Sequence, residues 1–177
     1  YNSGQDCTAP CRVIAGPGVY EGLVSELSSA VADLVTGDPL DEGTAVGPVI
    51  SRAQQERVQG MVDRAREGGA EVTVGGSVLD RPGFFYAPTV VAAPAQDSEL
   101  VQREVFGPVV SVQRFDDEAQ ALAWANGVDY GHVETPAPNA PSLIVVDKKT
   151  GKLLGEEASG LSQRIFHSNW SSPAYLK

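Results

Sequence analysis

Apolar residues along the chain follow two periods, one typical of strands and one typical of helices. Short apolar or alternating runs predict strands at 12–15, 71–74, 88–92 and 110–115. Stretches with apolar residues three and four positions apart predict helices at 19–35, between 51 and 68, and at 117–126. Because strands and helices alternate, we expect an α/β fold with three layers and a mostly parallel sheet.

Each predicted helix has one apolar face that we expect to be buried. On the first helix this face holds Leu23, Leu27, Val31 and Leu34, and the turn Thr36–Pro39 ends the helix. The second begins at a capping box of Ser51 and Gln54 and buries Val58, Met61, Val62 and Ala65. The third is capped by Asp116 and points Ala119, Leu122 and Ala125 inward. The aromatic run Phe84–Tyr86 either joins the core, which we favour, or forms the wall of a site.

Composition places the chain among ordinary globular proteins. It has 177 residues, 42% hydrophobic and 20% charged, and no apolar run near the ~20 residues of a membrane span. Its net charge of −10 argues against nucleic acid and anionic membranes as partners. The two cysteines form neither a disulfide scaffold nor a zinc-binding pattern with the histidines, so we expect no metal site. With no secretion signal recognised, we expect a cytoplasmic protein.

Charge divides the chain into two parts. Residues 1–131 hold eight arginines and no lysine, whereas all four lysines and both histidines lie after Gly131. The proline-rich stretch Thr135–Pro141 continues neither a helix nor a central strand. We therefore expect a boundary near 131–141 that separates 1–131 from 132–177. The alternative is one domain with a proline-rich loop.

Cys7 is the candidate nucleophile. It follows Gly4 in a small polar setting, ahead of the apolar run at 12–15. A turn followed by a helix would place backbone N–H groups near Cys7 and favour the reactive thiolate. The alternative is that Cys7 and Cys11 are both small buried core residues.

Two motifs a hundred residues apart resemble the aldehyde dehydrogenase family. The first is Asn-x-Gly-Gln-x-Cys at 2–7, and the second is Glu-x-Phe-Gly-Pro at 104–108. Matches between and after them, in the family's order, extend the resemblance over residues 1–131. They are Gly37–Leu40, Val46–Ser51, Gly68–Ala70, Tyr86–Val90 and Trp124–Asn126. Within the family, the first motif and the segment 101–112 look most like γ-aminobutyraldehyde dehydrogenase.

The resemblance implies a function for three residues. Cys7 would attack an aldehyde to form a thiohemiacetal, which passes hydride to NAD or NADP and leaves a thioester that water hydrolyses. Glu104 would contact the nicotinamide ribose and Phe106 would pack beside the nicotinamide. Without the resemblance, Glu104 reads as a solvated loop residue and Phe106 as a core residue.

Several parts of the family's catalytic apparatus have no match in these residues. The family's general-base glutamate, oxyanion asparagine and nucleotide-binding domain lie upstream of the cysteine, and its closing segment and oligomerisation strand follow the region of Tyr130. We therefore expect a partial catalytic domain that neither binds NAD nor oxidises an aldehyde alone. The family forms homo-oligomers, and we do not expect that of this chain.

The tail has a pattern of its own. Ser142–Leu154 predicts a strand, a tight turn at 147–151 and a second strand. It resembles one repeat of the pyrroloquinoline-quinone-type β-propellers, but Gly155 stands where those repeats usually have tryptophan. The alternative is a generic β-hairpin, and in either case we expect no quinone site.

Three functions fit the sequence to different degrees. The first is the dehydrogenase part described above, and the second is a non-catalytic fusion or truncation product in which both motifs are remnants. The third is a cysteine hydrolase, which needs a histidine base near Cys7. We reject the third because His132 and His167 both lie beyond the expected boundary.

The expected boundary gives a first prediction. Proline-rich links between unlike segments are exposed and poorly protected, so limited proteolysis is expected to cut first between Tyr130 and Pro141. Mass spectrometry of the early fragments locates the cut. First cuts within 51–74, with the link intact, would contradict the two-part organisation.

Overall fold

A computed structural model describes residues 2–127, 144–146 and 153–156. The structure divides into two compact units with the boundary between Val128 and Asp129. The expected link at 131–141 lies outside the described residues, so its exposure stays a prediction.

The first unit is built on a four-stranded sheet in the order β1-β4-β3-β2. The strands are β1 (Arg12–Ala15), β2 (Glu71–Val74), β3 (Thr89–Ala92) and β4 (Val109–Arg114). β4 pairs in parallel with both β1 and β3, and β2 closes one edge antiparallel to β3. The expectation of a mostly parallel sheet is confirmed.

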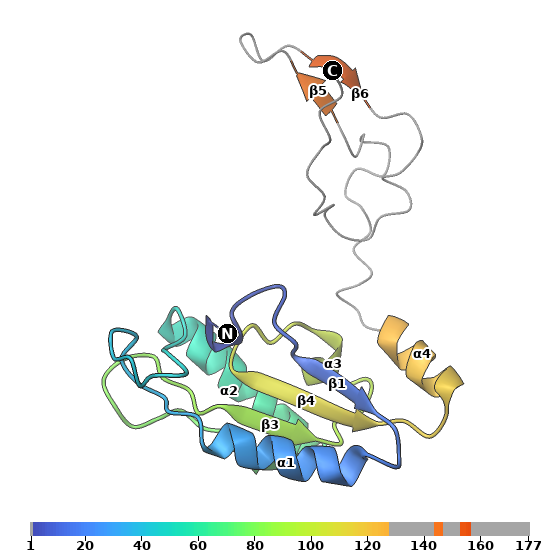
Figure 1. Cartoon of the computed structure of the whole chain (residues 1–177), viewed down its shortest axis with the longest axis horizontal. Helices are drawn as coiled ribbons and strands as arrows, with labels where there is room; N and C mark the ends of the chain where they lie inside the picture. The colour runs from blue at the N-terminus through green and yellow to red at the C-terminus, as the bar shows by residue number, and fades with distance from the viewer. Residues whose placement is uncertain (1, 128–143, 147–152, 157–177) are drawn as a thin grey trace. The chain divides into compact units, whose positions relative to one another are not determined.

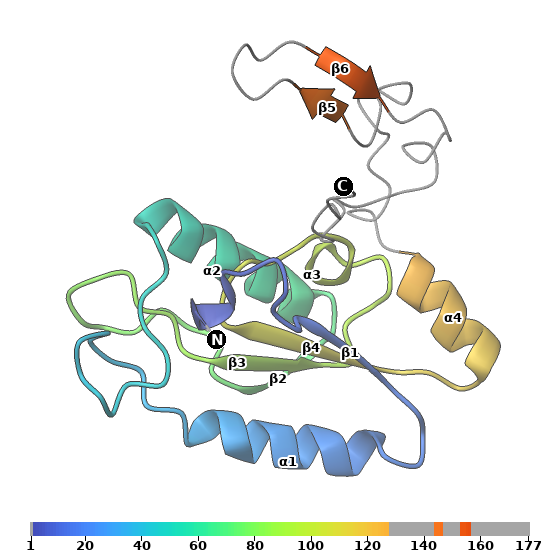
Figure 2. The ribbon, with the colours of Figure 1, turned by 45° about the horizontal axis from the view of Figure 1, so that its top comes forward.

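Two helices cover opposite faces of this sheet and give the expected three layers (Figure 1, Figure 2). Helix α1 (Tyr20–Ala32) packs against a cluster containing Val90 and Val112, and helix α2 (Arg52–Glu67) packs against one containing Val91 and Val109. Successive residues of a strand thus point into the two cores on opposite faces of the sheet, as the alternation of side chains along a strand requires. Strands buried on both faces explain the near-continuous apolar run of β3.

The first helix ends earlier than expected. The sequence predicted a helix to residue 35 with Leu34 on its apolar face, but α1 ends at Ala32 and Leu34 is 41% exposed. The reason is a competing backbone contact: the N–H groups of Ala45 and Val46 both donate to the carbonyl of Val35. The chain therefore leaves the helix before Thr36.

The second helix is confirmed, including its buried face. Val58, Met61, Val62 and Ala65 are all at most 4% exposed. Ser51 caps the helix by accepting from the Gln54 N–H at 3.2 Å. A capping box would also have the Gln54 side chain accept from the Ser51 N–H. That part of the prediction is wrong, because the Gln54 side chain donates instead to the carbonyls of a loop at 105–106.

Two short helices flank β4. The sequence pattern predicted no helix between 92 and 110, and the structure has a short one there, α3 (Glu99–Gln102). Helix α4 (Glu118–Asn126) is capped by Asp117 rather than Asp116, because the Asp117 carboxylate accepts from the Gln120 N–H at 2.8 Å.

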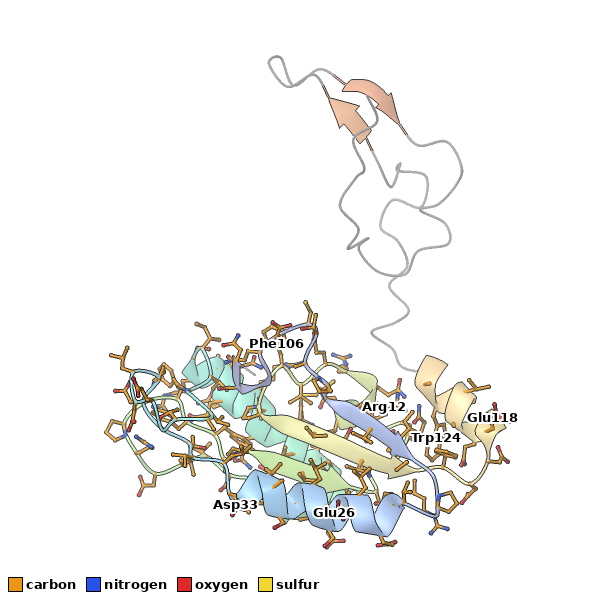
Figure 3. The ribbon with its side chains drawn as sticks, viewed as in Figure 1. Arg12, Glu26, Asp33, Phe106, Glu118 and Trp124 are labelled. Atoms are coloured by element: carbon orange, nitrogen blue, oxygen red, sulfur yellow. The ribbon has the colours of Figure 1, made fainter. Side chains whose placement is uncertain are left out.

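The expected inward face of α4 is wrong. The three residues that we expected to point inward, Ala119, Leu122 and Ala125, are all exposed, and Leu122 is 59% exposed. A polar contact holds this helix instead, since the Arg12 guanidinium donates to the Trp124 carbonyl at 2.9 Å (Figure 3). Two glutamine side chains, Gln96 and Gln113, each accept a further hydrogen bond from the Arg12 guanidinium.

The second unit contains an antiparallel pair of strands, β5 (Ile144–Val146) and β6 (Leu153–Glu156). The predicted pairing of two strands in the tail is confirmed, and the turn between them lies outside the described residues. Within the parts of the chain that the structure describes, no helix has the length and apolar character of a membrane span.

One buried side chain gives a stability prediction. Tyr86 is fully buried, and its hydroxyl has no hydrogen-bond partner among the described residues. Burial raises the pKa of this hydroxyl, and the charge of Asp63 raises it further, so the group stays neutral. Tyr86→Phe is therefore expected to keep or raise the free energy of unfolding, by up to about 1 kcal/mol.

The matched control is Tyr20, a second buried tyrosine, whose hydroxyl interacts with the Ala93 backbone. Tyr20→Phe is expected to lower the free energy of unfolding by roughly 1 kcal/mol. Urea unfolding followed by circular dichroism measures both. A clear loss of stability in Tyr86→Phe would show that its hydroxyl has a partner in solution.

Candidate active site

The first motif is anchored to a loop rather than to the sheet. It opens with a 3-10 turn, η1 (Asn2–Gly4), and the Ser3 hydroxyl donates to the Gly47 carbonyl at 2.9 Å. The Gln5 side chain contacts the same loop twice, donating to the Pro48 carbonyl at 3.3 Å and accepting from the Ile50 N–H at 2.7 Å. Gln5 thus fixes the chain just before the cysteine.

Cys7 lies in a tight turn and its side chain is exposed. The Ala9 N–H closes the turn on the Asp6 carbonyl at 2.9 Å. Thr8 donates its hydroxyl and its N–H to the Asp6 carboxylate, and these hydrogen bonds lower the pKa of Asp6. The turn is therefore held by its own side chains.

The helix that we expected after Cys7 is absent from the described residues. The chain runs from the turn directly into β1, where Val13 and Ile14 align with residues of β4. β-branched residues favour this extended pairing over a helix. The segment that follows Cys7 therefore supplies no helix N–H groups that could favour its thiolate.

The second motif forms a loop whose backbone carbonyls accept hydrogen bonds from side chains of helix α2. Arg57 donates to the Glu104 carbonyl at 2.7 Å and to the Val105 carbonyl at 2.6 Å. Gln54 donates to the Val105 carbonyl at 3.0 Å and to the Phe106 carbonyl at 2.7 Å. Both side chains come from the first turns of α2.

The two motifs meet through their glycines. A Cβ added to Gly4 would stand 2.0 Å from the Gly107 carbonyl oxygen, closer than any side chain permits. Gly107 is itself packed on α2, because a Cβ there would stand 2.7 Å from Val58. Chain segments a hundred residues apart are therefore in backbone contact.

Backbone strain gathers at this contact. Four non-glycine residues of the described chain have positive φ, and three of them belong to the motifs: Asn2, Ser3 and Phe106. Such conformations cost energy and are common at functional sites.

An open hollow of about 530 Å³ lies between the motifs. Its wall includes Asn2 and Gln5 from the first motif, Phe106 from the second (labelled in Figure 3), and Ile50 and Phe84. The aromatic run at 84–86 therefore divides: Phe84 is a wall residue, whereas Phe85 and Tyr86 are buried core.

A second cavity of about 200 Å³ lies behind the glycine contact and is mainly apolar. Cys11 lines it and is half-buried, and Cys7 is exposed, so the alternative in which both cysteines are buried core residues is wrong. Cys11 faces a hollow rather than a packed core.

The structure thus joins the motifs that the sequence singled out, and adds residues that the sequence did not. Cys7 follows the Gly4 contact, while Glu104 and Phe106 precede Gly107. Gln54 and Arg57 were missed, because Gln54 was assigned to the capping box; their spacing of three on one helix was the available signal. In the described ranges no three His, Cys, Asp or Glu residues form a group that could hold a metal.

Comparison with known proteins gives one consistent family. Residues 1–135 match the Aldehyde dehydrogenase family. An aldehyde dehydrogenase of Emericella nidulans is 34% identical over 131 residues, which is 74% of this chain and 26% of that protein. Lactaldehyde dehydrogenase of Escherichia coli is 33% identical over 173 residues, 96% of this chain and 36% of that protein.

Solved structures agree. An aldehyde dehydrogenase from Bacillus cereus, in an NAD+ complex, has a TM-score of 0.69 at 35% identity and covers 72% of this chain and 26% of that one. Betaine aldehyde dehydrogenase from Staphylococcus aureus, also in complex with NAD+, has a TM-score of 0.69 at 33% identity over the same shares. The chain spans about a quarter of the length of the first of the curated relatives that it matches. Since the family match covers most of its length, the chain belongs to the aldehyde dehydrogenase family.

Proposed function

We propose that this chain supplies the nucleophile and part of the nicotinamide site of an aldehyde dehydrogenase, with Cys7 as nucleophile and Glu104 and Phe106 as cofactor contacts. The observation that carries the proposal is the backbone contact between Gly4 and Gly107. It fixes the cysteine turn relative to the loop that bears the two cofactor residues.

The geometry of the Cys7 turn suits addition to a carbonyl. The thiol is exposed, and within residues 2–127 the Cys7 N–H has no hydrogen-bond partner. It can therefore donate to the oxyanion that forms when the sulfur adds to the aldehyde carbon. The Asp6–Thr8 contacts hold this N–H in place without occupying it.

The second motif suits the nicotinamide ring and the ribose attached to it. The Phe106 ring is 37% exposed and lines the hollow, which offers an apolar face for a flat ring. Glu104 is half-buried, and a carboxylate accepts from two neighbouring ribose hydroxyls. NAD, when bound, supplies the acceptor for the electrons of the oxidation.

The finer features of the proposal concern the substrate and the tail. The motif resemblance favours an aminoaldehyde as substrate. The tail beyond residue 131 is either propeller-like or of dehydrogenase origin. The alignment with lactaldehyde dehydrogenase covers 96% of the chain and so supports the second origin.

The two cysteines test which thiol is the nucleophile. Iodoacetamide is expected to label Cys7 well before Cys11 in the folded chain near neutral pH, because Cys7 is exposed and Cys11 is half-buried. Peptide mass spectrometry measures the two rates, and the urea-unfolded chain, where both label alike, is the control. Faster labelling of Cys11 would remove Cys7 as the candidate.

Activity tests the whole proposal. The 177 residues alone are expected to produce no NADH from any aldehyde, since the matching base and asparagine are not among them. A chimera in which residues 2–127 replace the matching segment of the Bacillus cereus relative is expected to form NADH. The Cys7→Ser variant of this chimera is expected to lose that activity, and the control variant Cys11→Ser is expected to keep it. A folded chimera that keeps its activity in Cys7→Ser would refute the assignment.

A further inference from the structure

We propose that Gln54 and Arg57 are positioning residues that hold the Phe106 backbone in its left-handed conformation and so fix how Phe106 lines the hollow and where the backbone of Glu104 lies. The proposal rests on the proposed function, which makes that loop a cofactor contact. It concerns two side chains that need not touch the cofactor themselves.

The first support is the pattern of hydrogen bonds. Three consecutive carbonyls, from Glu104 to Phe106, accept four hydrogen bonds from Gln54 and Arg57, all between 2.6 and 3.0 Å. The donors stand three positions apart and so share one face of α2. Two side chains therefore fix the peptide planes on both sides of Val105 and the one after Phe106.

The second support is the strain that these bonds oppose. Phe106 has a φ of 55°, a region that bulky side chains rarely adopt and that costs on the order of 1–3 kcal/mol. Relaxation of this φ by rotation of the Val105–Phe106 peptide would turn the Val105 carbonyl away from the Gln54 and Arg57 side chains that donate to it. The Gln54 amide thus favours the strained form over the relaxed one.

The third support is the rigidity of the helix that carries the donors. Ser51 caps α2, and Val58 and Met61 anchor it in the core with at most 1% exposure. Val58 also lies directly under Gly107. The same helix thus sets the position of both ends of the strained residue, which is what positioning by a fixed element requires.

The test uses the full chain with 4-fluorophenylalanine at its five phenylalanines, and the Phe106 fluorine resonance is assigned with Phe106→Leu. Gln54→Met keeps the length of the side chain but removes the donor. It is expected to shift the Phe106 resonance toward its position in the urea-unfolded chain, and to leave that of Phe85 in place. Arg57→Lys, which keeps a cationic donor, is expected to give a smaller shift in the same direction.

The matched control is Gln59→Met on the same helix. The Gln59 amide donates to Asp63 and to Gly76, away from the Phe106 loop. It is expected to leave the Phe106 resonance unmoved. No shift in Gln54→Met, or an equal shift in Gln59→Met, would overturn the proposal.

A double-mutant cycle with Phe106→Gly keeps the test decisive if the spectra of one variant are poor. Glycine adopts positive φ without help, so Gln54→Met is expected to lower the urea midpoint clearly less in the Phe106→Gly background than in the original chain. An equal loss in both backgrounds would overturn the proposal. Because no cofactor is present in either experiment, failure of the proposed function leaves both results interpretable.

Discussion

The approach of Gly4 to Gly107 allows no side chain at Gly4, Val58 crowds the Cβ position at Gly107, and the candidate site is arranged around that contact. Backbone packed on backbone is a stiffer link than two side chains, since no rotamer change can absorb a shift. The exposed thiol of Cys7 and the ring of Phe106 are therefore placed by main chain on both sides. Cys7, the proposed nucleophile, sits on a turn that makes its own internal hydrogen bonds, and none of these uses the Cys7 N–H.

Helix α2 serves the core and the loop at once. Its inner face, with Val58 and Met61, packs against one side of the sheet. Gln54 and Arg57, in its first two turns, donate hydrogen bonds to the loop carbonyls. Stability and site geometry are therefore coupled in this helix. A substitution in its core face that tilts α2 would also move Phe106, although it touches no residue of the hollow.

The sequence predicted most of the layers because their signals are local. The alternation in β4 and the spacing of Val58, Met61 and Val62 are set by burial on one face, and burial follows periodicity. It failed where a tertiary contact overrode the local pattern. Residue 35 left the helix for a backbone pairing with 45–46, and α4 is attached by the Arg12 contact to its Trp124 carbonyl rather than by the apolar face that Leu122 suggested. In the site, the motifs made Cys7, Glu104 and Phe106 candidates. Local patterns do not show which side chain binds a distant carbonyl, so the Gln54 side chain was assigned to the capping box instead of to the carbonyls of Val105 and Phe106.

The position of β1 bears on how the chain behaves at high concentration. β1 is an outer strand of the four-stranded sheet, and among the described strands it pairs with β4 alone, so one of its sides has no neighbouring strand in this sheet. The net charge of −10 keeps such edges apart by mutual repulsion. Added salt screens that repulsion, and acidification toward the isoelectric point near 4.5 removes it. Colloidal stability of the chain therefore depends on surface charge, which opposes association at this edge of the sheet.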